Sequence, residues 1–401
     1  MGQSTFPVPS SGSSTSTILP VNASSVILDG SLTSASTYTT TVNGNGGIAY
    51  LTATDNPATI TLGGTAYIIS ANTVVATTAV VGSGVSATVA ATYAQTAPAT
   101  FTASTMPNGA LWRAVAYGNG YFVSVSYNNN GGAYSTNGTS WTASTLSSSS
   151  RWQGVTYGNG YYVAVALGTN AGTYSTNGTT WTASTMSSLS DWYGVTYGNG
   201  KFVAVAQGTT AGAYSTNGTT WTASTMPSSS TWYGVTYGNG YYVAVASGTT
   251  AGAYSTNGTT WTASTLPSSS SWYGVTYGLV GTTPTYVAVQ GSATTAGAYS
   301  TNGTSWTAST MPSSSAWQGV TYGNGYFVAV ANGTTAGAYS SNGTTWTANT
   351  LPSSSSWYSV TYGNGYFVAT QSSGTTAGAY FAQTIALPVN FGIYNGPTTI
   401  N

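Results

Sequence analysis

The chain has 401 residues, of which 1% are charged, and its formal net charge is zero. It contains no cysteine and no histidine, which excludes disulfides and leaves no thiolate or imidazole for a metal site. With so few charged residues the chain has no basic patch that could bind nucleic acid, so we expect no nucleic-acid binding. It also contains no run of 18 apolar residues, which a transmembrane helix would need, so we expect no membrane insertion.

Residues 1–18 are rich in Ser, Thr, Gly and Pro, which predicts a flexible arm. Residues 19–92 predict a small β-domain of about seven strands, because runs rich in Val, Ile, Thr and Tyr alternate with glycine-rich turns. The first of these runs is V-I-L-D-G at 26–30. The domain carries no catalytic constellation, so we expect it to serve in anchoring or oligomerisation.

Residues 93–384 are built on one repeated stretch. Its first tryptophan recurs at five intervals of 40 residues and one of 45, as Trp112, Trp152, Trp192, Trp232, Trp272, Trp317 and Trp357. We number the repeats 1 to 7 by these tryptophans. Each repeat contains four short extended runs and no helical periodicity, and four strands in about 40 residues is the signature of a β-propeller blade.

The ends of this region predict how a propeller would close. Repeat 7 never reaches the W-T-A-S-T strand that ends the other repeats, whereas residues 101–105, F-T-A-S-T, match that strand and precede repeat 1. We therefore expect an all-β fold with a seven-bladed propeller of four-stranded blades, in which the two ends of the region share the last blade. Residues 385–401 are expected to form an extended C-terminal tail.

Six copies of the pattern Y-S-x-N-G-x-[ST]-W, for instance Ser215, Asn217, Gly218 and Trp221, join the third and fourth runs. This pattern resembles the Asp-box of BNR-like propellers, and the repeats are similar to those of phage tail and bacterial surface proteins. The resemblance implies a propeller fold but no particular activity, since the family contains both hydrolases and non-enzymes.

The residue inventory argues against catalysis. Glycoside hydrolysis normally needs two carboxylates, and residues 93–384 contain only Asp191. A nucleophilic serine would need a base that the chain does not supply. The sequence therefore predicts that the protein is not an enzyme and uses no cofactor or metal.

One position varies between repeats, immediately after the first tryptophan. Its side chains either fill space inside the fold or line one mouth of the ring, where aromatic and amide groups suit neutral carbohydrate. The candidate ligand-binding residues are Arg113, Gln153, Tyr193, Tyr233, Tyr273, Gln318 and Tyr358.

These features together predict a virion appendage, resembling a phage tail fibre or spike, that binds a neutral host-surface glycan and is released when the host lyses. The expected partners are that glycan, other virion proteins through the N-terminal domain, and further copies of the chain. Two alternatives stay open: a purely structural virion component that makes only protein contacts, and a cellular lectin or surface-layer protein.

Overall fold

The computed structural model describes residues 97–98, 100–372 and 377–382, together with the strands at 17–18, 37–44, 47–52, 58–62, 65–69, 77–81, 85–93 and 390–394. Contacts divide the chain into two compact units, Met1–Thr96 with Gln383–Asn401, and Ala97–Ala382. All the secondary-structure elements of the described residues are strands. The described residues accordingly contain no helix that is long and apolar enough to cross a membrane.

The first unit contains two sheets. The five-stranded sheet has the order β1 (Thr17–Ile18), β2 (Thr37–Gly44), β7 (Val85–Tyr93), β4 (Ala58–Leu62) and β5 (Thr65–Ile69). The three-stranded sheet has the order β32 (Asn390–Tyr394), β3 (Gly47–Thr52) and β6 (Thr77–Val81). The expected arm at 1–18, apart from β1, and the strand expected at 26–30 lie outside the described residues.

The C-terminal segment differs from the expected extended tail. Within residues 385–401, β32 pairs antiparallel with β3, from Ile48 opposite Tyr394 to Thr52 opposite Asn390. The run N-F-G-I-Y at 390–394 has the aromatic and β-branched side chains that favour a strand, and β3 offers it an edge. The first unit is therefore assembled from both ends of the chain.

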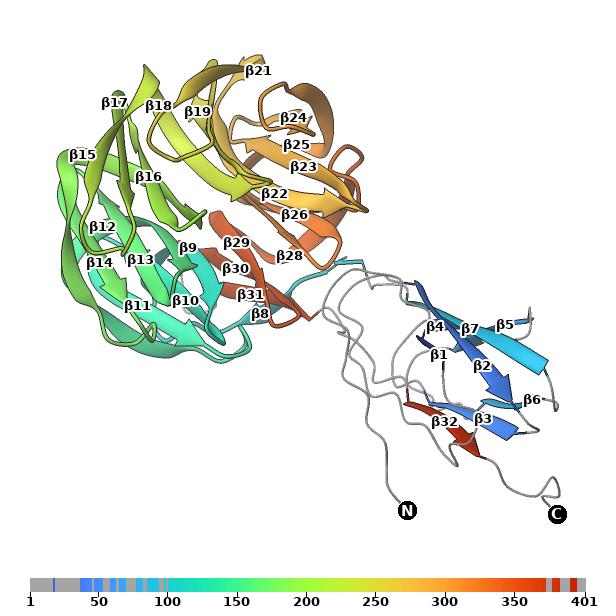
Figure 1. Cartoon of the computed structure of the whole chain (residues 1–401). Coiled ribbons are helices and arrows are strands. Elements are labelled where there is room, and N and C mark those ends of the chain that lie inside the picture. The colour runs from blue at the N-terminus through green and yellow to red at the C-terminus, as the bar shows by residue number, and fades with distance from the viewer. Residues whose placement is uncertain are drawn as a thin grey trace. The chain divides into compact units, whose positions relative to one another are not determined.

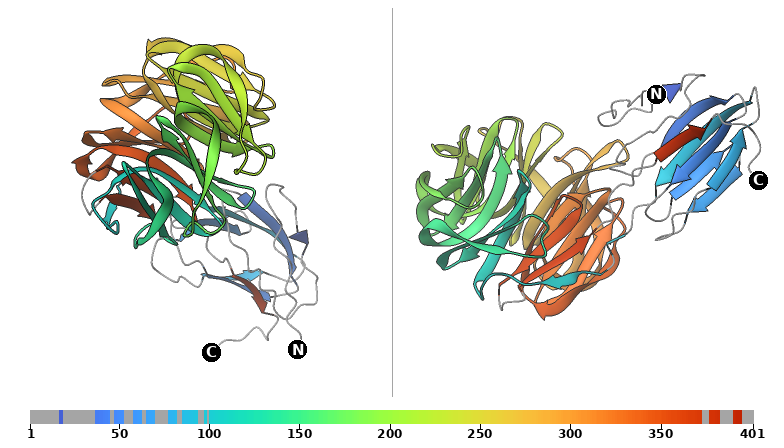
Figure 2. Two further views of the ribbon diagram at one scale, coloured as in Figure 1. Left: turned by 90° about the vertical axis from the view of Figure 1, so that its left-hand side faces the viewer. Right: turned by 90° about the horizontal axis from the view of Figure 1, so that it is seen from below.

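The second unit is a series of antiparallel meanders (Figures 1 and 2). β8 (Thr102–Ser104) precedes repeat 1, and the first three repeats contain β9 (Leu111–Gly118), β10 (Tyr121–Tyr127), β11 (Asn129–Ser135), β12 (Thr142–Gly158), β13 (Tyr161–Leu167), β14 (Thr169–Ser175), β15 (Thr182–Gly198), β16 (Lys201–Gln207) and β17 (Thr209–Ser215). Repeats 4 and 5 add β18 (Thr222–Gly238), β19 (Tyr241–Ser247), β20 (Thr249–Ser255), β21 (Thr262–Ser270), β22 (Trp272–Val280), β23 (Thr283–Gln290) and β24 (Thr294–Ser300). The last two add β25 (Thr307–Gly323), β26 (Tyr326–Asn332), β27 (Thr334–Ser340), β28 (Thr347–Ser355), β29 (Trp357–Gly363), β30 (Tyr366–Gln371) and β31 (Gly378–Ala382).

The serine-rich segments that connect neighbouring repeats are strands. β12 pairs with β11 through Thr142–Thr145 and with β13 through Arg151–Gly158, so one strand ends one meander and begins the next. β15, β18 and β25 do the same. Within this segment the Ser148 and Ser150 hydroxyls, 3.1 Å apart, bond to each other.

The tight turns follow the glycine and asparagine signals. Asn119 and Gly120 both have positive φ, 43° and 82°, as the two central residues of a type I′ hairpin turn require. In the second kind of turn, the Ser215 hydroxyl accepts a hydrogen bond from the Gly218 N–H at 2.9 Å. The Asn217 side-chain oxygen Oδ1 accepts from the backbone N–H groups of Thr219 and Thr220, both at 3.0 Å.

The core lies between neighbouring meanders. All seven first tryptophans are fully buried, with 0% exposure. Trp192, for instance, packs with Val163 and Val165 of the preceding repeat and with Phe202 of its own. The tryptophans therefore join each sheet to the next through apolar contacts. In a chain with so few charges, burial of apolar surface is the strongest favourable contribution to the free energy of folding.

Contacts of one kind recur from each repeat to the next. The glycine that ends the first strand of a repeat lies flat against a tyrosine ring of the following repeat, as Gly118 does against Tyr157. The same relation holds for Gly363 and Tyr117, which belong to repeats 7 and 1. In addition, β8 pairs antiparallel with β31, with Ser104 opposite Gly378. Segments from the two ends of the second unit are thus in direct contact.

Candidate functional site

The seven variable positions share an irregularity of the backbone. In every repeat the register of the first strand shifts between the tryptophan and the residue two positions later, so the residue between them is the extra residue of a β-bulge. Strand alternation alone would not place these side chains, because a bulge redirects the residue that it adds. Trp152, for example, pairs with Ala166 and Gly154 with Val165, which leaves Gln153 without a partner in the ladder.

Three of the seven residues form a polar arc. The Arg113 Nε–H donates to Gln153 Oε1 at 2.5 Å. The guanidinium carbon of Arg113 also lies 3.6 Å from the centre of the Tyr358 ring, which is cation–π geometry. Gln153 is buried, whereas Arg113 and Tyr358 are half-buried.

Three of the other four form a tyrosine arc. The Tyr233 ring lies between two neighbours, with centroids 4.1 Å from Tyr193 and 4.3 Å from Tyr273. Tyr273 and Gln318 both lie against Gly291, where there is no room for a side chain. The structure thus brings six of the seven predicted residues into contact with at least one other of the set, and the seventh, Gln318, meets Tyr273 at this glycine.

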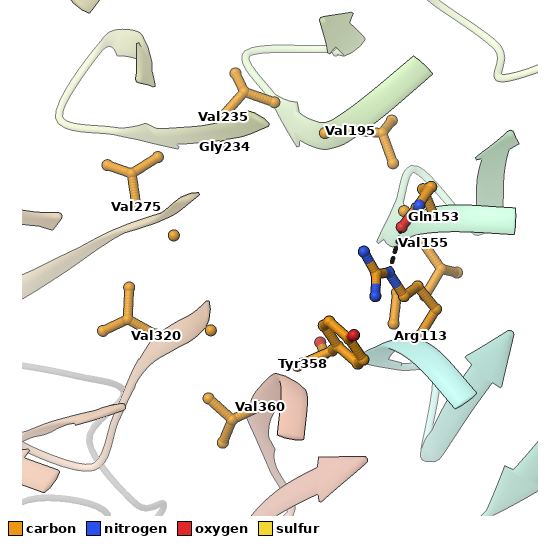
Figure 3. A pocket seen from close by; sticks show the side chains of 16 residues that line it. Arg113, Gln153, Val155, Val195, Gly234, Val235, Val275, Val320, Tyr358 and Val360 are labelled. Atoms are coloured by element: carbon orange, nitrogen blue, oxygen red, sulfur yellow. Dashed lines mark hydrogen bonds between the residues drawn. The ribbon is translucent and has the colours of Figure 1, made fainter. Parts of the chain in front are cut away.

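Two hollows adjoin the arcs. One, the axial channel, has a volume of about 190 Å³ and is lined by Arg113, Gln153 and Tyr358 and by a valine from each of six repeats (Figure 3). The other, which we call the rim pocket, has a volume of about 270 Å³ and is lined by Leu111, Arg113, Tyr127, Gln153, Tyr193, Tyr358 and Ser372. Both hollows share the three residues of the polar arc.

Tyr127, Leu111 and Ser372 were not predicted. Tyr127 stands where the next three repeats have Leu167, Gln207 and Ser247, so it is the aromatic exception at a position that otherwise varies without pattern. Its ring centre lies 5.9 Å from the Arg113 guanidinium carbon. Comparison of the repeats could have marked this position, but only the fold brings it beside Arg113.

The hydroxyl group of Tyr233 is neutral at physiological pH. Burial, together with a 3.3 Å hydrogen bond to the Tyr193 hydroxyl, raises the pKa of Tyr233 above its ordinary value of 10.0. Arg113 is therefore the one charged side chain among the described residues that line the two hollows. The described residues also contain no group of three or more His, Cys, Asp or Glu side chains that could hold a metal ion.

No family model and no curated protein matches the sequence. Solved structures do match. Virginiamycin B lyase from Staphylococcus aureus has a TM-score of 0.63 and 12% identity, covering 72% of this chain and 99% of its own. YCF48 from Cyanidioschyzon merolae has a TM-score of 0.52 and 12% identity, covering 75% and 99%. The Swd1 β-propeller domain of Myceliophteria thermophila has a TM-score of 0.54 and 9% identity, covering 70% and 99%.

The fold is a β-propeller. The prediction of an all-β propeller is confirmed by these structures and by the meanders of the second unit. The prediction that the chain is not an enzyme is contradicted, because virginiamycin B lyase is an enzyme with a similar fold. At 12% identity the likeness shows the fold alone, so this propeller receives no activity from it.

Proposed function

We propose that the propeller binds carbohydrate, and that the rim pocket holds one sugar residue of the ligand. The observation that carries this proposal is the lining of the pocket, which combines three tyrosines with amide, hydroxyl and guanidinium donors. Aromatic rings offer apolar faces to the C–H surface of a sugar, and the surrounding polar groups can bond its hydroxyls. A volume of about 270 Å³ suits a single residue rather than a buried chain.

The tyrosines differ in what they can offer a ligand. Tyr233 lies between Tyr193 and Tyr273, so its faces are occupied by its neighbours. Tyr193 is the member of the tyrosine arc that also lines the rim pocket. The proposal therefore assigns the stacking contact to Tyr193, whose ring packs against Tyr233. We expect one site at the mouth rather than one in each repeat.

A binding measurement on immobilised glycans tests this assignment. The wild-type chain should be retained by at least one oligosaccharide of a bacterial surface-glycan panel. Tyr193→Ala should weaken that retention about tenfold or more, because an aromatic contact face is lost. Tyr273→Ala is the matched control, since it removes a ring of the same arc that does not line the pocket.

Retention of Tyr273→Ala should stay within about twofold of wild type, a difference that corresponds to less than about 0.5 kcal/mol. Melting curves of both variants show whether they are folded. The proposal fails if the wild-type chain binds no glycan of the panel, or if Tyr193→Ala binds as well as wild type. Failure on every glycan, with binding to other virion proteins intact, would favour the purely structural role.

We further propose a closed, seven-bladed ring of the Asp-box type. Its support is the β8–β31 pairing and the Gly363–Tyr117 contact, which continue between repeats 7 and 1 the relations seen between other neighbours. The Ser215 and Asn217 hydrogen bonds support the Asp-box assignment, because they use short polar side chains to fix the turn. A closed ring would leave no sheet without a neighbouring sheet.

The setting that we propose is a virion appendage, with the first unit as the attachment or oligomerisation part. Its support is the composition, since a chain with 1% charged residues presents hydroxyl, amide and aromatic groups in place of charges. Mass spectrometry of purified virions tests this setting. Recovery of the chain only from host-cell surfaces would favour the lectin or surface-layer alternative.

A further inference from the structure

The rim pocket contains one positively charged side chain, that of Arg113. A neutral glycan, which the composition led us to expect, would not need a charged partner. Among the described residues the one carboxylate side chain is Asp191, whose Oδ1 lies 3.9 Å from Nη2 of Arg151 in an exposed ion pair. Lys201 lies elsewhere, with its Nζ donating to the Asn257 carbonyl oxygen at 3.0 Å. Arg113 is thus held by neutral groups, Gln153 and Tyr358, rather than by a described acid.

The way Arg113 is held leaves one edge of it available. Its Nε–H is engaged by Gln153, and one face of the guanidinium lies over the Tyr358 ring. Figure 3 shows the terminal nitrogens of Arg113 directed toward the open centre of the channel. Two parallel N–H groups on one edge match the two oxygens of a carboxylate, which is the geometry of a bidentate pair.

The two repeats that carry Arg113 and Tyr358 differ from the other five at the next residue. Five repeats have glycine two positions after the first tryptophan, and a Cβ on any of these would come closer than 3.0 Å to a carbonyl oxygen of the next repeat. The other two repeats have Ala114 and Ser359 instead, in the strands that also carry Arg113 and Tyr358. The Ser359 hydroxyl accepts a hydrogen bond from the Val115 N–H at 3.2 Å, so it joins repeats 7 and 1 beside the guanidinium.

We infer that Arg113 recognises a carboxylate at the polar arc shared by the rim pocket and the axial channel, and that the sugar held in the rim pocket is an acidic one of the uronic-acid class. This inference rests on the carbohydrate binding proposed above. One guanidinium balances one negative charge, which favours a carboxylate over a doubly charged phosphate monoester. Tyr127, Tyr193 and Tyr358 then flank the ring of the same sugar, while Gln153 positions Arg113. Arg113 is the group that touches the ligand.

The chain supplies its own neutral substitution for the test. Repeats 2 and 6 carry Gln153 and Gln318 at the position of Arg113, so Arg113→Gln introduces a residue that this bulge already accommodates. The probes are uronic-acid oligosaccharides of gluco, galacto and manno configuration, each beside its counterpart with the carboxyl groups reduced to alcohols. Binding is measured by calorimetry on the full chain, at low and at high salt.

The wild-type chain should bind at least one acidic probe about tenfold or more tightly than its reduced counterpart, and added salt should reduce that preference. Arg113→Gln should bring the ratio close to one, because it removes the positive charge and keeps an amide that can bond the hydroxyls of either probe. Equal affinity of the wild-type chain for acidic and reduced probes overturns the carboxylate inference but leaves the proposed function standing. Binding of neither kind of probe overturns both. An unchanged preference in Arg113→Gln also overturns the inference, because the discrimination then comes from elsewhere.

Discussion

The guanidinium carbon of Arg113 lies 3.6 Å from the centre of the Tyr358 ring, so the first and last repeats meet at the mouth of the channel. The same pair of repeats is joined on another side by the Gly363–Tyr117 contact. The most distinctive chemistry of the propeller therefore lies at the junction where its two ends come together. The other junctions join nearly identical repeats and share one kind of interface. Residues at the junction of repeats 7 and 1 could therefore differ, and form a specific site, without altering that shared interface.

Removal of β8 should destabilise the second unit. A chain of residues 108–382 loses β8 and also the buried side chains of Phe101 and Met106, which are 3% and 1% exposed. The loss of a buried phenylalanine alone costs about 3–5 kcal/mol. We expect residues 97–382 to melt cooperatively and residues 108–382 to melt far lower or aggregate, as measured by circular dichroism. Equal melting temperatures would show that β8 adds nothing to the fold.

The sequence predicted the propeller because its period, turns and tryptophans are local signals repeated seven times. It did not predict the bulge, since nothing in the order Trp152, Gln153, Gly154 states that Gln153 is left out of the ladder. It also did not predict that the rings of Tyr193, Tyr233 and Tyr273 contact one another in a row, because that depends on the distance between sheets. The strand β32 was missed for a related reason: its partner β3 lies at the other end of the chain.

The glycine that ends each first strand should be intolerant of a side chain. A Cβ on Gly238 would lie inside the van der Waals radius of the Tyr277 ring, whereas one on Gly109 meets nothing within 4 Å. Gly238→Ala should destabilise the second unit by about 1–3 kcal/mol through overpacking. Gly109→Ala should be nearly neutral. Urea unfolding of both variants measures the difference, and equal midpoints would mean that the two sheets move apart at little cost.

Asn349 should hold the segment that leads into β8. Five repeats have serine at the equivalent position, as in Ser144, whereas the Nδ2–H of Asn349 donates to the Pro98 carbonyl oxygen at 2.8 Å. The N–H of Phe101 bonds to the Thr350 carbonyl oxygen at 2.9 Å in the same region. Asn349→Ser should leave the melting temperature almost unchanged but accelerate hydrogen exchange at the Phe101 amide about two- to tenfold. Unchanged exchange would show that Asn349 does not fix this segment.

The stability of the propeller should depend on pH only in alkaline solution. Burial raises the pKa of Tyr162, Tyr242 and Tyr286 above the ordinary value of 10.0, so the folded protein keeps these protons at pH values where the unfolded chain loses them. The resulting stabilisation is fully present below about pH 10 and is lost as the pH rises beyond it. The free energy of unfolding should therefore stay level between about pH 6 and pH 9 and fall steeply above about pH 10.

Phenylalanine variants separate this effect from general alkaline damage. Repeats 1 and 3 have Phe122 and Phe202 at the position of Tyr162, so the site accepts phenylalanine without a change of shape. Each substitution does remove a hydrogen bond, since the Tyr162 hydroxyl donates to the Gly118 and Tyr121 carbonyl oxygens. The triple Tyr→Phe variant at 162, 242 and 286 should consequently be less stable than wild type near neutral pH, yet lose less stability between about pH 9 and pH 11.5. Parallel curves for the two proteins would show that other groups carry the alkaline transition.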